Sequence, residues 1–213
     1  MTFHKTLGLA LAFMLAAPPA LAAEAQIGEP APAFTLTGID GRSVSLEDFA
    51  GQTVVLEWTN HQCPFVKKHY DGGNMQRQQA EATGKGVAWL VINSSAPGKQ
   101  GHVTPEQARA IQAGWEAGQD AYLFDTDGEV GRAYGAKTTP HMYIIDADGV
   151  LRYNGAIDSI QSADVADIEK AEQFVEIALA ELAAGEPVSR PLTRPYGCSV
   201  NTSAGLTEVL APT

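Results

Sequence analysis

Apolar residues recur along this chain of 213 residues with the spacings of both strands and helices. Residues 52–59 and 86–93 carry near-continuous apolar runs, which are typical of buried central strands. Shorter strands are predicted at residues 33–37, 43–45, 121–125, 141–146 and 150–153. Two Asp-Gly pairs, at residues 40–41 and 148–149, mark tight turns that join neighbouring strands into hairpins.

Helical patterns alternate with these strands. Capping boxes at residues 45–48 and 104–107 predict helical starts, because each has Ser or Thr followed three residues later by an acidic or amide side chain. Helices are predicted at residues 64–82, 105–117, 128–134 and 168–184. Strands and helices alternate in the middle of the chain, which implies parallel strands there. The hairpin predicted at residues 141–153 implies that one side of the sheet is antiparallel. The prediction is an α/β domain with a mixed central sheet flanked by helices.

The N-terminus has the plan of a secretory signal peptide. Lys5 precedes an apolar stretch at residues 7–16, and Ala20-Leu21-Ala22 forms a small-residue cleavage site. The apolar stretch is about half the ~20 residues that span a bilayer. We therefore expect residues 1–22 to be removed on export to the periplasm, with no membrane span in the mature protein. Residues 23–185 are then predicted as one domain and residues 186–213 as a proline-rich, extended C-terminal tail.

Charge and cysteine content narrow the function. With 14 basic and 25 acidic residues the net charge is −11, which argues against nucleic acid as a partner. The two cysteines, Cys63 and Cys198, permit one intramolecular disulfide, and an oxidising compartment allows it.

Cys63 lies where a predicted strand passes through a short loop into a helix. The first free N–H groups of a helix and its dipole stabilise a thiolate, the nucleophilic form of cysteine. Pro64 suits the start of that helix, where its missing N–H costs nothing. Lys67, Lys68 and His61 would add positive potential. The alternative is a buried, inert cysteine.

Several motifs occur in an order that resembles one known group. The chain is similar to the peroxiredoxin-like redoxin proteins, in the alkyl hydroperoxide reductase and thiol-specific antioxidant branch of the thioredoxin superfamily. The resemblance runs from about residue 27 to 200. Its motifs are Ile27–Phe34, Asn60–Tyr70, Asn74–Gln76, Gly131–Ala136, Thr138–Pro140, Ile145–Gly149 and Pro195–Val200.

The resemblance implies a thioredoxin-like fold with Cys63 as the first redox residue. It implies that Thr139-Pro140 is a cis-proline turn that faces Cys63 and shapes the substrate groove. The Cys63 thiolate would then attack a hydroperoxide or a disulfide, and an external thiol would supply electrons. On this basis no bound cofactor is expected.

The sequence also departs from the family. A thioredoxin has a second cysteine where this chain has Val66. A typical peroxiredoxin has threonine at the position of Asn60 and proline at that of Leu56. Asn60 would supply a side-chain hydrogen bond in place of the threonine. These departures keep a rival open, a non-catalytic binding module in which Cys63 is a remnant or a ligand.

The role of Cys198 has three alternatives. As a resolving thiol it would condense with a sulfenic acid on Cys63 to form a disulfide. As a structural residue it would tie the tail to the domain. In the third alternative the two sulfurs never meet.

Metal handling is the remaining alternative. His61, Cys63, His69 and His141 offer ligands that suit Cu(I) or Zn. The C-x-x-x-C arrangement of copper carriers is missing, however, and His69 is expected to be a solvated helix residue. We therefore expect no metal site.

Overall fold

A seven-stranded mixed sheet forms the centre of the computed structural model, which describes residues 24–202. The predicted signal peptide lies outside the described residues. The strand order is β2-β1-β5-β4-β3-β7-β8. The strands are β1 (Thr35–Gly38), β2 (Ser43–Ser45), β3 (Val54–Trp58), β4 (Ala88–Asn93), β5 (Ala121–Phe124), β7 (His141–Ile145) and β8 (Leu151–Gly155). The parallel strands β3, β4 and β5 are flanked by antiparallel neighbours, so the predicted mixed sheet and N-terminal hairpin are confirmed.

The central strand β3 is buried along its whole length. In the register of the sheet, Leu56 lies between Leu90 of β4 and Tyr143 of β7. Successive side chains of a strand point to opposite faces. Val55 therefore joins one apolar core, and Leu56 joins the other.

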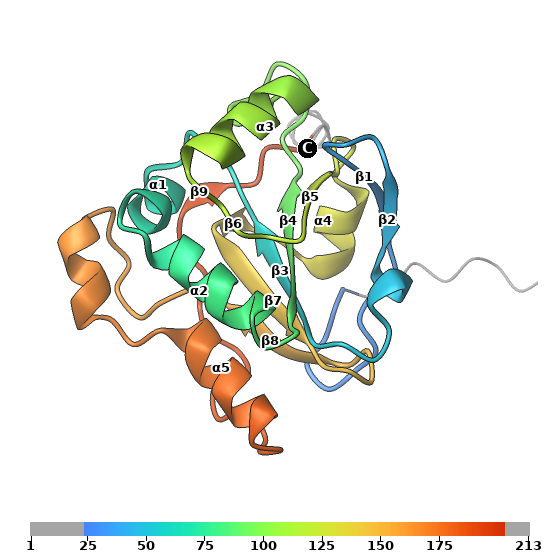
Figure 1. Cartoon of the computed structure of the whole chain (residues 1–213), viewed down its shortest axis with the longest axis vertical. Coiled ribbons are helices and arrows are strands. Elements are labelled where there is room, and N and C mark those ends of the chain that lie inside the picture. Colours follow the sequence, from blue (N-terminus) through green and yellow to red (C-terminus); the bar gives the residue numbers. More distant parts are fainter. Residues whose placement is uncertain (1–23, 203–213) are drawn as a thin grey trace, which may run out of the picture.

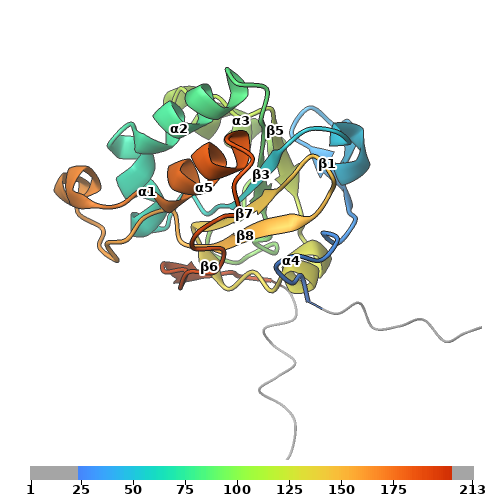
Figure 2. The same cartoon turned by 90° about the horizontal axis from the view of Figure 1, so that it is seen from below.

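Helices cover the two faces unequally. Four helices pack on the face of Val55, whereas α4 lies on the opposite face, as Figures 1 and 2 show. The four are α1 (Pro64–Asp71), α2 (Asn74–Thr83), α3 (Pro105–Gly114) and α5 (Phe174–Ala183); α4 spans Glu129–Tyr134. Two short 3₁₀ helices, η1 (Leu46–Phe49) and η2 (Val165–Lys170), complete the set in the described part. Among residues 24–202 no helix is both long and apolar enough to cross a bilayer.

Two helix predictions were wrong in extent. The helix predicted at 64–82 is two helices, because Gly72 and Gly73 interrupt it and Gly73 has φ of 69°. The helix predicted at 168–184 begins only at Phe174. Ala171 and Gln173 have extended backbones there, and the N–H of Phe174 bonds to the carbonyl of Ile157 at 3.1 Å. Residues 168–170 belong to the 3₁₀ helix η2, and the pairing of residues 172–174 with the segment after β8 separates η2 from α5.

The C-terminal segment returns along the sheet to the cysteine. Residues 188–202, which we name the strap, run beside β8, where the N–H of Asn154 bonds to the carbonyl of Pro191 at 2.9 Å. A Cβ on Gly155 would lie 2.0 Å from the hydroxyl of Thr193, so glycine is required at this contact. The strap includes β9 (Cys198–Ser199), which pairs antiparallel with β6 (Thr138–Thr139).

Candidate redox site

Cys63 is the N-cap residue of α1, at the carboxyl end of β3. Its backbone is extended (φ −72°, ψ 123°), and Pro64 occupies the first helical turn. The Cys63 N–H bonds to the carbonyl of Asn60 at 3.0 Å, and its carbonyl accepts from the N–H of Lys67 at 2.9 Å. The side chain makes no cap bond to the helix, so its sulfur is available to other groups.

Three segments meet at the sulfur of Cys63, which is fully buried. Its Sγ–H donates to the carbonyl of Thr139, with 3.0 Å between sulfur and oxygen. The backbone N–H of Cys198 donates to the same sulfur at 3.4 Å. Thr139-Pro140 is a cis peptide bond, as the family resemblance implied. The structure thus brings Cys63, Thr139, Pro140 and Cys198 together.

Gly197 makes the approach of the strap possible. It has φ of 139°, which residues with a side chain rarely adopt. A Cβ at this position would lie 1.9 Å from the carbonyl oxygen of Thr139. Only glycine therefore lets the strap lie this close to the cis-proline turn.

Cys198 is partly buried beside Cys63, and neither residue is in a disulfide. Burial, together with the hydrogen bond and the electrostatic interaction with Cys63, raises the pKa of the Cys198 thiol to about 12. The N–H of Cys198 lies 3.4 Å from the Cys63 sulfur, so the two residues are neighbours in this fold.

The loop before Cys63 is fixed by side chains. The Asn60 Oδ1 accepts the N–H of Gln62 at 2.9 Å, and the Gln62 side chain accepts the N–H of Gly101 at 3.2 Å. Asn60 is buried, and its Nδ2 finds no hydrogen-bond partner within residues 24–202. Asn60 therefore retains a free donor in the loop that precedes Cys63.

The expected roles of two neighbouring basic residues were wrong. Lys68 does not present a free charge to Cys63, because its ammonium group is buried against the Asp158 carboxylate at 2.9 Å. His69, predicted as solvated, is fully buried, and burial lowers its pKa to about 4. Sequence reasoning missed Asp158, because nothing local links it to residues ninety positions earlier in the chain.

The candidate metal ligands do not form a shared site. His69 Nδ1 bonds to the Asn74 amide at 2.8 Å, and His141 Nε2 bonds to Asn154 Oδ1 at 2.8 Å. Burial lowers the pKa of His141 to about 4 as well. Within the described chain, no group of three or more His, Cys, Asp or Glu side chains has a metal-binding arrangement.

Glu57 is a second buried group that sequence reasoning missed. Burial raises its pKa to about 7, against hydrogen bonds that lower it. Its carboxylate accepts from the indole N–H of Trp89 at 2.9 Å, the Tyr70 hydroxyl at 2.9 Å and the Gln79 amide at 3.3 Å. An acidic residue inside the apolar run of β3 was the signal available in the sequence.

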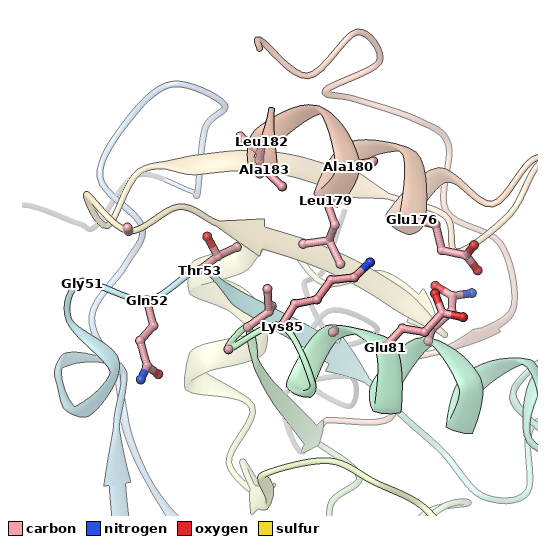
Figure 3. A pocket seen from close by; sticks show the side chains of 15 residues that line it. Gly51, Gln52, Thr53, Glu81, Lys85, Glu176, Leu179, Ala180, Leu182 and Ala183 are labelled. Carbon is pink, nitrogen blue, oxygen red and sulfur yellow. The ribbon is translucent and has the colours of Figure 1, made fainter. Parts of the chain in front are cut away.

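A surface hollow lies away from the cysteines. It has a volume of about 350 Å³ and lies between α2 and α5, where Figure 3 shows Lys85 reaching toward α5. Its wall includes Gln52 and Thr53, which precede β3, whereas Cys63 follows β3. The hollow is therefore at the opposite end of this strand from Cys63.

Comparison with known proteins agrees with the geometry. The Redoxin family matches residues 26–171. The methylamine utilization protein MauD of Paracoccus versutus is 28% identical over 155 residues, which cover 70% of this chain and 71% of MauD. A structure described as an uncharacterized conserved protein of Geobacillus kaustophilus is 29% identical, covers 82% of this chain and 91% of its own, and has a TM-score of 0.70. A candidate thiol:disulfide interchange protein DsbE of Chlorobium tepidum is 26% identical, with 62% of this chain and 85% of that chain covered and a TM-score of 0.50. This chain, with its thioredoxin-like fold, belongs to the Redoxin family.

Proposed function

We propose that this redoxin is a periplasmic thiol oxidoreductase in which Cys63 and Cys198 form one redox pair. The observation that carries the proposal is the hydrogen bond from the Cys198 N–H to the Cys63 sulfur at 3.4 Å. The second cysteine, absent from the position of Val66, is supplied in space by the strap. The pair would then carry out the thiol–disulfide exchange that a C-x-x-C motif carries out within a single loop.

With a disulfide as oxidant, the Cys63 thiolate attacks one sulfur of the substrate. The substrate S–S bond breaks, a mixed disulfide forms on Cys63, and the other half leaves and takes up a proton. Cys198 then attacks the Cys63 sulfur and releases the second half. The protein ends with one internal disulfide and has given up two electrons and two protons.

With a hydroperoxide as oxidant, the O–O bond breaks on attack by Cys63. The hydroxyl group remains on sulfur as a sulfenic acid, and water or an alcohol leaves. The Cys198 thiol displaces the hydroxyl as water and forms the same internal disulfide. An external thiol donor returns the pair to the dithiol form in either case.

The environment of Cys198 fits the role of second thiol. Burial is the main cause of its raised pKa, and the interaction with Cys63 adds to it. Opening of the strap would expose Cys198 to water and ease its deprotonation for the resolving step.

Burial limits how substrate arrives. Cys63 is fully covered in the reduced protein, and β9 pairs with the edge of the cis-proline turn. We infer that the strap opens locally to admit substrate to Asn60, Pro64, Thr139 and Pro140. The unpartnered Asn60 amide is the donor we assign to the bound oxidant.

The class of protein and its location have separate support. A thiol:disulfide interchange role is the one suggested for the Chlorobium tepidum relative, which shares 26% identity. The periplasmic location rests on the signal-peptide pattern of residues 1–22. Cell fractionation with N-terminal sequencing of the exported protein tests it.

The activity is tested with two oxidants at equal concentration, hydrogen peroxide and oxidised glutathione. We expect the reduced wild type to lose both thiols, and Cys63→Ser to lose none. Cys198→Ser should stop at a sulfenic acid or a mixed disulfide on Cys63. The faster oxidant assigns the substrate class. Equal consumption by wild type and Cys63→Ser would contradict the proposal and leave the binding-module alternative.

A further inference from the structure

A buried tyrosine anchors the strap two residues before Cys198. The hydroxyl of Tyr196 donates to Asp158 Oδ1, while Asp158 Oδ2 accepts from the Lys68 ammonium group at 2.9 Å. The Lys68 and Asp158 side chains are both fully buried. The acceptor of the tyrosine is therefore a charged group that is itself held in place by a paired charge.

The ring of Tyr196 packs on the helix that begins at Cys63. Its centroid lies 5.7 Å from that of Phe65, in an edge-to-face arrangement, and 5.8 Å from the Lys68 nitrogen. His69 Nε2 lies 3.3 Å from the Tyr196 hydroxyl. Three residues of α1 thus contact Tyr196 of the strap. The helix that begins at Cys63 therefore also fixes the position of the strap.

The strand pair alone is a weak anchor. β6 and β9 contain two residues each, far below the length of a stable hairpin. Tyr196 and Cys198 are two residues apart, a reach of about 7 Å along an extended chain. A hydrogen bond to a charged, buried acceptor is stronger than a neutral one and costly to leave unmade. Beyond Cys198 the strap is held by backbone bonds, from the N–H of Val200 to the carbonyl of Lys137 at 3.1 Å and from the N–H of Ala96 to the carbonyl of Asn201 at 2.9 Å. On the side before Cys198, Tyr196 is the residue that bonds to a buried charged pair.

We propose that Tyr196, through its hydroxyl bond to the Lys68–Asp158 pair, is a positioning residue that holds Cys198 against Cys63. The inference rests on the proposed function for its redox consequence. Its structural part, that Tyr196 keeps the strap closed over Cys63, stands without it. The two parts are therefore measured separately.

The test is Tyr196→Phe, which removes the hydroxyl and keeps the ring against Phe65. Tyr134→Phe is the matched control, because the Tyr134 hydroxyl also donates a hydrogen bond, to the carbonyl of Pro32 at 2.7 Å, but lies outside the strap. In glutathione buffers we expect the equilibrium constant for the Cys63–Cys198 disulfide to fall about tenfold in Tyr196→Phe, which is about 30 mV. In a Cys198→Ser background, alkylation of Cys63 should become about tenfold faster, because the strap opens more often.

These measurements distinguish a local effect of Tyr196 on the strap from a general loss of stability. Thermal unfolding of both tyrosine variants shows whether they are comparably stable. Unchanged disulfide equilibrium and unchanged alkylation in Tyr196→Phe would overturn the inference, as would equal changes in Tyr134→Phe. If wild type forms no internal disulfide while Tyr196→Phe still speeds alkylation, the proposed function fails and the anchor stands.

Discussion

Gly197→Ala places a methyl group between the strap and the cis-proline turn. The new Cβ would lie 1.9 Å from the Thr139 carbonyl oxygen, whereas real contacts of this kind are no shorter than 3.0 Å. The strap must therefore retreat by at least about 1 Å. The N–H of Cys198, now 3.4 Å from the Cys63 sulfur, would then lose its hydrogen bond.

The backbone strain of alanine at position 197 sets the size of the effect on the disulfide equilibrium. Holding alanine at φ of 139° costs on the order of 1–3 kcal/mol. If about 2 kcal/mol of this acts on the docked strap, the equilibrium constant for the Cys63–Cys198 disulfide falls roughly thirtyfold. Equilibration in glutathione buffers, followed by alkylation and mass spectrometry, measures that constant.

Gly185→Ala is the matched control for backbone strain. Gly185 also has a positive φ, 74°, but a Cβ there would meet no atom within 4 Å. It lies just after α5, before the strap begins. We expect this variant to keep the disulfide equilibrium of the wild type within about threefold. A wild-type equilibrium constant in Gly197→Ala would refute the reasoning that a close glycine contact holds Cys198 in place.

Two further predictions concern pH. The pKa of Glu57 is raised from 4.5 to about 7, so the folded protein binds a proton that the unfolded chain releases, and stability is lost as pH rises through this window. The free energy of unfolding of Glu57→Gln, measured with denaturant, should therefore rise relative to that of wild type by about 3 kcal/mol between pH 4 and pH 8. A difference that does not change with pH would contradict this prediction. In the same variant the free energy of unfolding should fall as pH drops from 6.5 to 4, because His69 and His141 have pKa values lowered to about 4 and resist protonation when folded. A flat profile over that range would show that these two histidines are less buried than described.

The sequence predicted the parts of the fold that local pattern determines. Buried strands leave apolar runs, so β3 and β4 were located correctly, and the strand-to-helix junction placed Cys63. The capping box at Thr104 gave the start of α3, where the hydroxyl accepts the N–H of Gln107 at 3.3 Å. The break after α1 was missed, although the consecutive Gly72 and Gly73 were its signal in the sequence.

Contacts between distant segments were not predictable in this way. The pairing of β6 with β9 involves two residues on each side and leaves no periodic signal. The need for glycine at position 197 becomes evident only when the strap meets Thr139. The bond between Tyr196 and Asp158 joins residues 38 positions apart, in segments with no shared motif. The family resemblance indicated Cys198 as a candidate redox residue, but only the fold shows that it lies beside Cys63.

The central claim is that Cys63 and Cys198 form one intramolecular redox pair. Peptide mapping without reduction, after the purified protein has been treated with a stoichiometric oxidant and unreacted thiols have been alkylated, tests it most directly. The account predicts a single pair of peptides joined through Cys63 and Cys198 within a monomer, and its loss on reduction. Two separately alkylated cysteines, or a disulfide between two chains, would contradict the account.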